Sequence, residues 1–241
     1  DDEQVEIRPA ESYWGMGALS CEAQLKKDLS EDFQILTIGP AGEKRVRFAC
    51  ISHDFGRQAG RTGVGAVLGS KNIKAIAVRG TGRLPVYDME RAYAAGKDAY
   101  RKVFAKTGFK EWTPEGTAGI TDWTNAVGVF PTRNFQTSYA EHHKSINGKA
   151  ILDQLKITDK GCFCCPTPCG KYGHTKTDLG DAFVEGPEYE TIALFGGNCL
   201  LRTISEVAYA NYVCDELGID TISAGAVISW GIECFGKKIL S

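Results

Sequence analysis

The sequence lacks long apolar runs and lacks an excess of charge of either sign. No stretch of about 18 consecutive apolar residues occurs in the chain, so we expect no transmembrane helix and no membrane partner. The printed sequence does not begin with methionine, and we expect no signal peptide or targeting tail within it. Because 28 Lys and Arg residues oppose 30 Asp and Glu residues, the net charge is only -2, and a nucleic-acid partner is not expected.

Cysteine is abundant, yet its placement argues against a disulfide framework. Four of the nine cysteines fall between positions 162 and 169, and the total is odd. Free cysteines in apolar-periodic segments mostly behave as small core side chains. The scattered ones are Cys21, Cys50, Cys199, Cys214 and Cys234. Free thiols on this scale predict a cytoplasmic protein in a reducing compartment.

The order of the predicted elements indicates an α+β fold. With 43% hydrophobic and 24% charged residues, the composition is that of a globular protein with an ample core. We predict strands at residues 4–8, 33–38, 46–51 and 73–78. Between them we predict a helix at 18–29, a turn at 39–42, a loop rich in Gly and Arg at 53–63, and a short helix ending at Ser70.

The mixture of predicted strands and short helices ends near Gly80, Gly82 and Pro85, and mostly helical patterns follow. We therefore predict two domains: residues 1–84, which contain the mixed β-sheet portion, and residues 85–241, which are mostly α-helical. Asp88 is placed to cap a helix over residues 88–106. Further helices are predicted at 117–127, 149–155, 205–217 and 221–235.

The cysteine cluster is the most specific chemical signal in the chain. Cys162, Cys165 and Cys169 form a C-x2-C-x3-C pattern, which lets three thiolates of one tight loop each reach a different iron of a cubane cluster. Pro166 and Pro168 keep this segment from forming a regular helix. The pattern favours an iron–sulfur cluster over zinc or unliganded thiols, because zinc sites typically pair two such motifs.

A [4Fe–4S] cluster needs a fourth ligand, which this spacing does not supply. Within the chain the candidates are Cys164, Cys199, Cys214 and Cys234. The alternative is a residue that lies beyond Ser241. Because Cys164 is adjacent to Cys165, its side chain must point elsewhere, and we expect it to be a bystander.

A second signal is the glycine- and arginine-rich segment that precedes the short helix. Its glycines let backbone N–H groups approach an anion, and Arg57 and Arg61 can each make two parallel hydrogen bonds to phosphate oxygens. The segment therefore predicts a phosphate-bearing cofactor. A structural turn with solvated arginines remains the alternative, since neither a dinucleotide-binding pattern nor a Walker motif is present.

Two acidic motifs follow the cysteine loop. Residues 186–190 (GPEYE) open an apolar helical run, and Glu190 there could act as a general base in a cofactor cleft. Residues 215–220 (DELGID) join two helices, with Gly218 at a helix end and Asp220 as the cap of the next helix. Taken alone, both motifs are explained by helix capping and by the helix dipole.

These segments, taken together and in this order, resemble the tungsten-containing aldehyde:ferredoxin oxidoreductases. The resemblance rests most strongly on residues 57–80 and covers nearly the whole chain. The other matching segments are 38–43 (IGPAGE), 134–137 (NFQT), the three-cysteine loop, 186–190 and 214–223.

The family implies a β-sheet domain that seats two molybdopterins chelating one tungsten or, less often, molybdenum, under mostly helical domains. The resemblance assigns pterin-phosphate contacts to Arg57, Gly60 and Arg61, and a bridging Mg²⁺ to the main-chain oxygen of Gln58. It assigns the second pterin to Asp215, Ile219 and Asp220, and an active-site carboxylate to Glu190. Cys162, Cys165 and Cys169 would ligate a [4Fe–4S] cluster beside a pterin.

The implied reaction is the two-electron oxidation of a small aldehyde to a carboxylic acid, with ferredoxin or a similar protein accepting electrons from the cluster. A homo-oligomer is compatible with the resemblance. Two alternatives remain. One is a member of the same superfamily that reduces an acyl thioester or a carboxylic acid. The other is a non-catalytic iron–sulfur or zinc module for electron transfer, which would have no need of a phosphate-binding loop.

The sequence departs from the family pattern in three places. The family's earlier sheet segment is missing before Asp1, and the later segment with the fourth cluster cysteine and an active-site His is missing after Ser241. We therefore expect a piece of a longer chain that cannot complete the site alone. Some members carry a Glu at the position of Tyr209 as part of an intersubunit metal site, so we do not predict that metal here.

Overall fold

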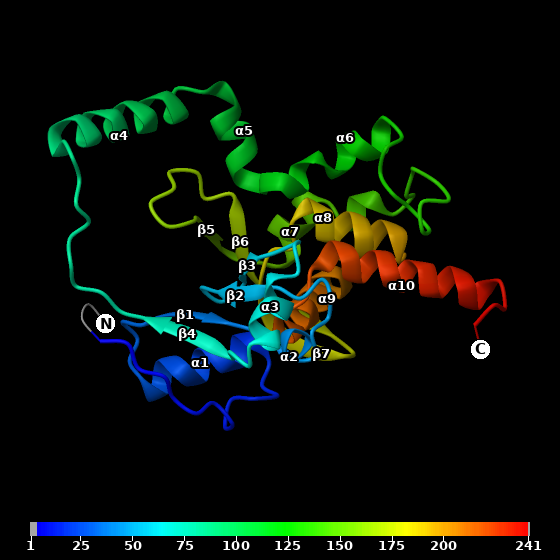
Figure 1. Cartoon of the computed structure of the whole chain (residues 1–241). Helices are drawn as coiled ribbons and strands as arrows, with labels where there is room; N and C mark the ends of the chain where they lie inside the picture. The colour runs from blue at the N-terminus through cyan, green and yellow to red at the C-terminus, as the bar shows by residue number, and fades with distance from the viewer. Residues whose placement is uncertain (1–3, 241) are drawn as a thin grey trace.

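The computed structural model describes residues 4–240, so Asp1 to Glu3 of the first predicted domain and Ser241 of the second lie outside the described residues. A four-stranded antiparallel sheet comes first, and a mostly helical part with a second sheet follows (Figure 1). This order confirms the predicted α+β class. No helix of the described chain is both long and apolar enough to cross a membrane.

The first sheet has the strand order β3-β2-β1-β4. Its strands are β1 (Gln34–Thr37), β2 (Ile51–His53), β3 (Arg57–Ala59) and β4 (Ala75–Val78). Three helices accompany them: α1 (Ala18–Asp28), α2 (Pro40–Glu43) and α3 (Val64–Ser70). These elements confirm the predicted helices at 18–29 and up to Ser70, and the predicted strands at 33–38 and 73–78. The segment at 39–42, predicted as a turn, forms the short helix α2 instead.

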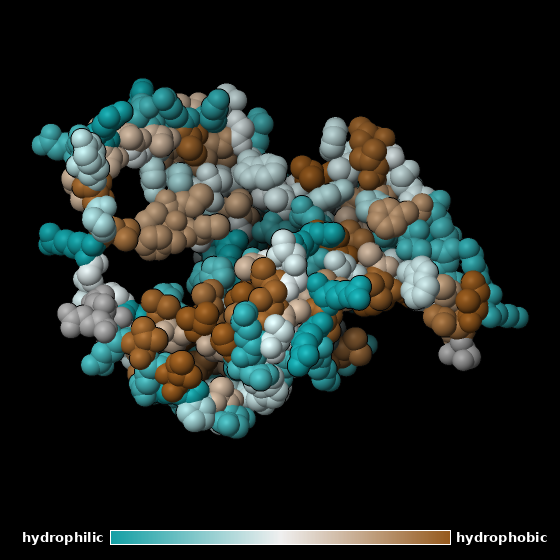
Figure 2. Space-filling view, in the orientation of Figure 1, coloured by the Kyte–Doolittle hydropathy of each residue, from teal (hydrophilic) through white to brown (hydrophobic). Residues whose placement is uncertain are grey.

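Alternation along β1 and β4 decides which face of this sheet is packed. Ile35 is buried, pairs with Ala77 and packs in a cluster with residues of α1. The next pair, Leu36 and Ile76, points to the opposite face and is exposed. Figure 2 shows apolar side chains gathered on this side of the molecule, over β4 and α3.

Two predicted strands are wrong. Residues 4–8 form no strand, and Val5 and Ile7 are almost fully exposed, because no described strand lies beside them to supply hydrogen bonds. The run at 46–51 becomes a strand only from Ile51. Directly before it, Phe48 O accepts from Asp220 N (3.0 Å) and Cys50 N donates to Gly218 O (2.8 Å). Both partners lie at the junction between α9 (Ile204–Leu217) and α10 (Thr221–Gly236).

No helix or strand lies between β4 and α4, where we predicted the domain boundary, and the two-domain division stays a prediction. The helices that follow are α4 (Met89–Phe104), α5 (Thr107–Glu115), α6 (Thr121–Ala126), α7 (Gly148–Gln154), α8 (Tyr189–Thr191), α9 (Ile204–Leu217) and α10 (Thr221–Gly236). The short turns η1 (Gly116–Ile120) and η2 (His143–Ser145) and the π-helix η3 (Ile192–Asn198) complete this part.

The predicted helix caps are confirmed. The Asp88 side chain accepts a hydrogen bond from Arg91 N at the start of α4. This helix has no buried residue and lies over the cysteine loop, where the Tyr100 hydroxyl donates to Cys164 O (Figure 1). The hydrophobic core lies instead among α7, α8, η3, α9 and α10. Its fully buried side chains include Phe130, Ile146, Ile192, Ile204 and Val207.

A second sheet inside the helical part escaped prediction. It has the order β5-β6-β7, with β5 (Lys156–Lys160), β6 (Gly170–Thr177) and β7 (Gly180–Glu185) all antiparallel. Its strands carry many charged residues and three glycines, which hide the alternation that usually marks a strand. The cysteine loop is the connection between β5 and β6.

Candidate functional site

A cleft of about 340 Å³ lies between the first sheet and the helical part. Its lining comes from β3, the end of β7, α8, α9 and the start of α10. The lining residues are Cys50, Gly56, Arg57, Gln58, Gly60, Glu185, Glu188, Glu190, Thr191, Asn211, Asp215, Ile219, Asp220, Thr221 and Ile222. A hollow of about 330 Å³ beside Val129 and Phe135 has no charged residue in its lining and none of the predicted site residues.

The cleft therefore gathers residues that the sequence places far apart. Arg57, Gln58 and Gly60 come from one segment. Asp215, Ile219 and Asp220 come from a segment more than 150 positions later. Glu190 also lines the cleft, and it is exposed. Arg61 is outside the lining, with Nη1 3.7 Å from Asp220 Oδ2 and its side chain 58% exposed.

The junction of α9 and α10 is held tightly against the first sheet. Gly218 has φ +69°, and a Cβ atom there would lie 2.7 Å from Gly39 N, so the position requires glycine. Asp220 caps α10 by accepting from Ile222 N (3.3 Å) and Ser223 N (2.9 Å), as predicted. Helix capping is therefore one role of the Asp220 carboxylate. Because Asp220 also lines the cleft, it could in addition contact a bound molecule.

Asp215 is 4% exposed and receives two hydrogen bonds. Gln58 Nε2 donates to Oδ1 (3.0 Å), and Asn211 Nδ2 donates to Oδ2 (2.8 Å). Burial raises the pKa of Asp215 well above its usual value, although both donors favour the charged form. Ser52 Oγ in turn donates to Gln58 Oε1 (2.7 Å), so the Gln58 side chain ties β2 and β3 to α9.

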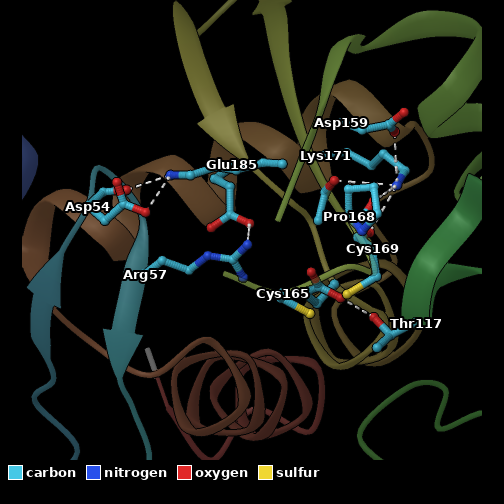
Figure 3. A network of polar contacts seen from close by, with 12 residues as sticks. Asp54, Arg57, Thr117, Asp159, Cys165, Pro168, Cys169, Lys171 and Glu185 are labelled. Carbon is cyan, nitrogen blue, oxygen red and sulfur yellow. Dashed lines mark hydrogen bonds and ion pairs between the residues drawn. The ribbon is translucent and has the colours of Figure 1, made fainter. Parts of the chain in front are cut away.

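Glu185 is a site residue that sequence reasoning missed. Its carboxylate is 5% exposed, and Oε1 lies 3.1 Å from Arg57 Nη2 (Figure 3). Burial raises the pKa of Glu185 to about 6, against the opposing effect of Arg57 and Lys160. Its one sequence signal was its place directly before the 186–190 motif. Asn211, which joins Asp215 to Thr191, was also missed.

Arg57 offers hydrogen-bond donors that the protein does not use. Its Nε and Nη2 atoms are buried and have no hydrogen-bond partner among the described residues, and the contact to Glu185 is an ion pair. Buried donors of this kind are costly unless something accepts from them. An anionic group in the cleft would satisfy them, so the residues present fit a phosphate-bearing ligand.

Glu188 and Glu190 stand at the helical side of the cleft. Glu188 accepts a hydrogen bond from Thr117 Oγ1, which itself accepts from Tyr189 N (3.0 Å). These bonds fix the start of α8 against η1. Glu190 lies in the first turn of α8, where its exposed carboxylate can meet a molecule entering the cleft.

The three predicted cluster cysteines lie on one loop next to this cleft. Cys162 and Cys165 are exposed, and Cys169 is half-buried. Cys165 N donates to Cys162 O (2.9 Å), which bends the loop, and the positive φ of Cys164 (+55°) turns the chain at that residue. Figure 3 shows the thiols of Cys165 and Cys169 between Arg57 and Thr117.

Thiolates are the donors that iron–sulfur clusters require, so this loop fits such a group chemically. Among residues 4–240, no three His, Cys, Asp or Glu side chains converge as they would around a single metal ion. Of the candidate fourth ligands, Cys214 is part of the helical core and Cys199 packs against it. The fourth ligand stays an open prediction.

Matches to known families cover most of the chain. Residues 1–80 match the model of the aldehyde ferredoxin oxidoreductase N-terminal domain, and residues 94–241 match that of domains 2 and 3. A tungsten-containing aldehyde ferredoxin oxidoreductase of Thermococcus kodakarensis is 40% identical over all of this chain and 40% of its own length. One of Pyrococcus furiosus is 38% identical over 98% of this chain and 39% of its own length.

The chain thus spans about two fifths of the length of the curated relatives it matches. A solved structure of the active-site complex BamBC of benzoyl coenzyme A reductase, bound to 1,5-dienoyl-CoA, superimposes with a TM-score of 0.77. It covers 99% of this chain and 38% of the other, with 23% sequence identity. At that identity the likeness is one of fold.

Proposed function

This chain belongs to the aldehyde ferredoxin oxidoreductase family, and from that premise we propose that the protein oxidises aldehydes to carboxylic acids. The reaction takes an aldehyde and water to a carboxylic acid, two protons and two electrons. A tungsten (or molybdenum) bis-molybdopterin group would supply the two-electron redox chemistry when bound. The electrons would leave singly through a [4Fe–4S] cluster to ferredoxin.

The observation that carries this proposal is the cleft itself. It brings the Arg57 segment, the 215–220 corner and Glu190 around one space, with buried Arg57 donors that lack acceptors. Arg57, Gly60 and Arg61 would bind the pterin phosphates, and the main-chain oxygen of Gln58 would bind the bridging Mg²⁺. Two forked guanidiniums and the glycine backbone supply the donors that phosphates need.

The remaining residues would either orient the second pterin or transfer a proton. Asp215, Ile219 and Asp220 would hold the second pterin, since carboxylates can accept from polar ring edges. Glu190 would accept a proton during the oxidation, because its carboxylate is exposed on the cleft wall. Cys162, Cys165 and Cys169 would supply three thiolates to the cluster.

Metal analysis of the anaerobically purified protein tests this proposal. We expect tungsten or molybdenum together with about four irons per chain, the content of one cubane cluster. Zinc without iron would overturn the assignment. A second experiment measures dye-linked oxidation of a panel of small aldehydes and, in parallel, reduction of acyl thioesters and carboxylic acids. The comparison separates aldehyde oxidation from the reductive reactions considered for this superfamily.

We further propose a cytoplasmic location, which rests on the free thiols. A homo-oligomer remains an expectation from the family resemblance. Tyr209, the position of the intersubunit metal site in some members, donates its hydroxyl to Leu179 O (2.9 Å) and so contributes to the packing of α9 against the β6–β7 turn.

A further inference from the structure

Lys171 is a buried lysine at the beginning of β6, two residues after Cys169. Its side chain is only 4% exposed, a rare position for an ammonium group. Burying a charge is costly unless hydrogen bonds and a counter-charge compensate for it. The surroundings of Lys171 must therefore supply both.

Main-chain carbonyl groups of the cysteine loop provide most of that compensation. Lys171 Nζ lies within hydrogen-bond distance of Cys169 O (3.0 Å), Pro168 O (3.2 Å) and Gly170 O (3.3 Å). It also donates to Thr113 O (2.9 Å) at the end of α5. The counter-charge is Asp159 of β5, whose Oδ1 lies 3.1 Å away (Figure 3).

Three consecutive carbonyls can face one ammonium only if the chain curls around it. Here the third predicted cluster cysteine, Cys169, is the middle residue of the curled segment. Neighbouring groups leave it little freedom, because a Cβ atom at Gly116 would lie 2.4 Å from Cys169 O. On the other side, a Cβ atom at Gly170 would lie 2.6 Å from Glu185 Oε1.

We infer that Lys171 is a positioning residue for Cys169 and a fixed positive charge beside the cluster that this thiolate would ligate. The ammonium holds the carbonyls of residues 168–170 inward, which sets the direction in which the Cys169 thiol leaves the backbone. The charge part of this inference rests on the proposed function. Because a reduced cluster carries one more negative charge, a nearby cation stabilises it and raises its reduction potential.

Lys74 offers a matched control in the same chain. Its side chain is 1% exposed, and its ammonium contacts Glu43 Oε1 (2.6 Å), Ile38 O (2.7 Å) and Met16 O (2.8 Å). It is therefore another buried lysine with an acidic partner and carbonyl acceptors, placed directly before β4 of the first sheet and away from the cysteine loop. Lys74→Met and Lys171→Met should cost comparable stability but differ in their effect on the loop.

The first measurement uses the protein after removal of its metals, with N-ethylmaleimide as the probe and mass spectrometry of the Cys169 peptide as the readout. We expect Lys171→Met to accelerate labelling of Cys169 about tenfold, the effect of losing hydrogen bonds to a charged group on a local opening equilibrium. Lys74→Met should leave that rate at the wild-type value. Equal rates in the two variants would overturn the positioning role.

The second measurement is the reduction potential of the cluster in the iron-loaded protein, titrated by EPR. We expect a lower potential in Lys171→Met than in both the wild type and Lys74→Met. Lys171→Arg, which keeps the charge, should retain the wild-type potential and label Cys169 a few times faster. A wild-type potential in Lys171→Met would overturn the charge role.

Two further outcomes are also decisive. If Lys171→Met fails to fold, Lys171→Arg carries the test, and wild-type labelling of Cys169 in that variant would overturn the inference. If the wild-type protein binds no iron under any condition, the proposed function fails, while the labelling experiment on the metal-free protein still decides whether Lys171 positions Cys169.

Discussion

The cleft and the cysteine loop are built in opposite ways, although they adjoin each other. The loop takes its three thiols from eight consecutive residues, and most of it is exposed. The cleft takes its lining from segments on both sides of that loop and buries three carboxylates, those of Glu185, Asp215 and Asp220. A contiguous ligand set is visible in a sequence as a spacing, whereas a dispersed one exists only after the chain has folded.

Replacing single cysteines in the loop should give the largest effect. We expect Cys165→Ser to abolish the visible absorbance of the cluster and to lower the iron content, because a hydroxyl is a poor substitute for a thiolate ligand. The control is Cys164→Ser in the adjacent position, where absorbance should be retained. If the Cys164 variant loses the cluster instead, the ligand assignment within this loop is wrong.

Replacing Arg57 tests whether the cleft and the loop are separable. Arg57→Met removes the unsatisfied donors of the cleft and leaves the Glu185 carboxylate buried without its partner. We expect tungsten and phosphate content to fall while iron is retained, and the free energy of unfolding in urea to drop by about 3 kcal/mol. The control is Arg61→Met, whose exposed side chain should contribute less than about 1 kcal/mol to stability. Simultaneous loss of iron would show that the two regions form one unit.

Gly218→Ala probes the corner that closes the cleft against the first sheet. The substitution places a Cβ atom at φ +69° and 2.7 Å from Gly39 N, so we expect the free energy of unfolding to fall by about 2 kcal/mol. Gly231→Ala, inside α10 and with no atom within 4 Å of the new Cβ, should raise stability by up to about 1 kcal/mol. Equal effects at the two positions would contradict the tight junction.

The pH dependence of stability isolates the buried carboxylate of Glu185. Its folded pKa of about 6 lies above the ordinary 4.5, so the folded state binds more protons than the unfolded state between these values. Stability of the metal-free protein must therefore fall as the pH rises from about 4.5 to 6, by up to about 2 kcal/mol from this group. In Glu185→Gln we expect a flatter curve over that window in urea titrations. An unchanged slope would show that Glu185 is not the group responsible.

Local rules predicted a large part of the fold. Asp88 and Asp220 were recognised as helix caps because short carboxylates accept from the first free N–H groups of a helix. Gly218 was recognised as a helix end for a similar local reason. The strand at 73–78 and the helix at 18–29 followed from their periodicity. Each of these signals lies within a few residues of the feature that it predicts.

The two wrong strand predictions share a cause, because a strand forms only where another strand lies beside it to share backbone hydrogen bonds. The predicted strand at 4–8 needed a neighbour that the described chain does not supply. The run from Val46 to Ile51 was predicted as a strand, but Phe48 O and Cys50 N bond to residues of the α9–α10 junction, and Val46 N donates to Ala41 O. The sheet of β5, β6 and β7 was missed because its charged residues and glycines obscure the alternation.

By itself the sequence determined the cysteine spacing, the helix caps and the family to which the chain belongs, since all of these depend on the order of residues along one segment. Only the tertiary structure decided that Arg57 meets Glu185 and that Gln58 reaches Asp215. It also decided that the Lys171 ammonium contacts the main-chain carbonyls of residues 168–170. The first two contacts join residues from different elements, and the third needs a lysine that folding has buried; in each case burial favours a partner for the polar group.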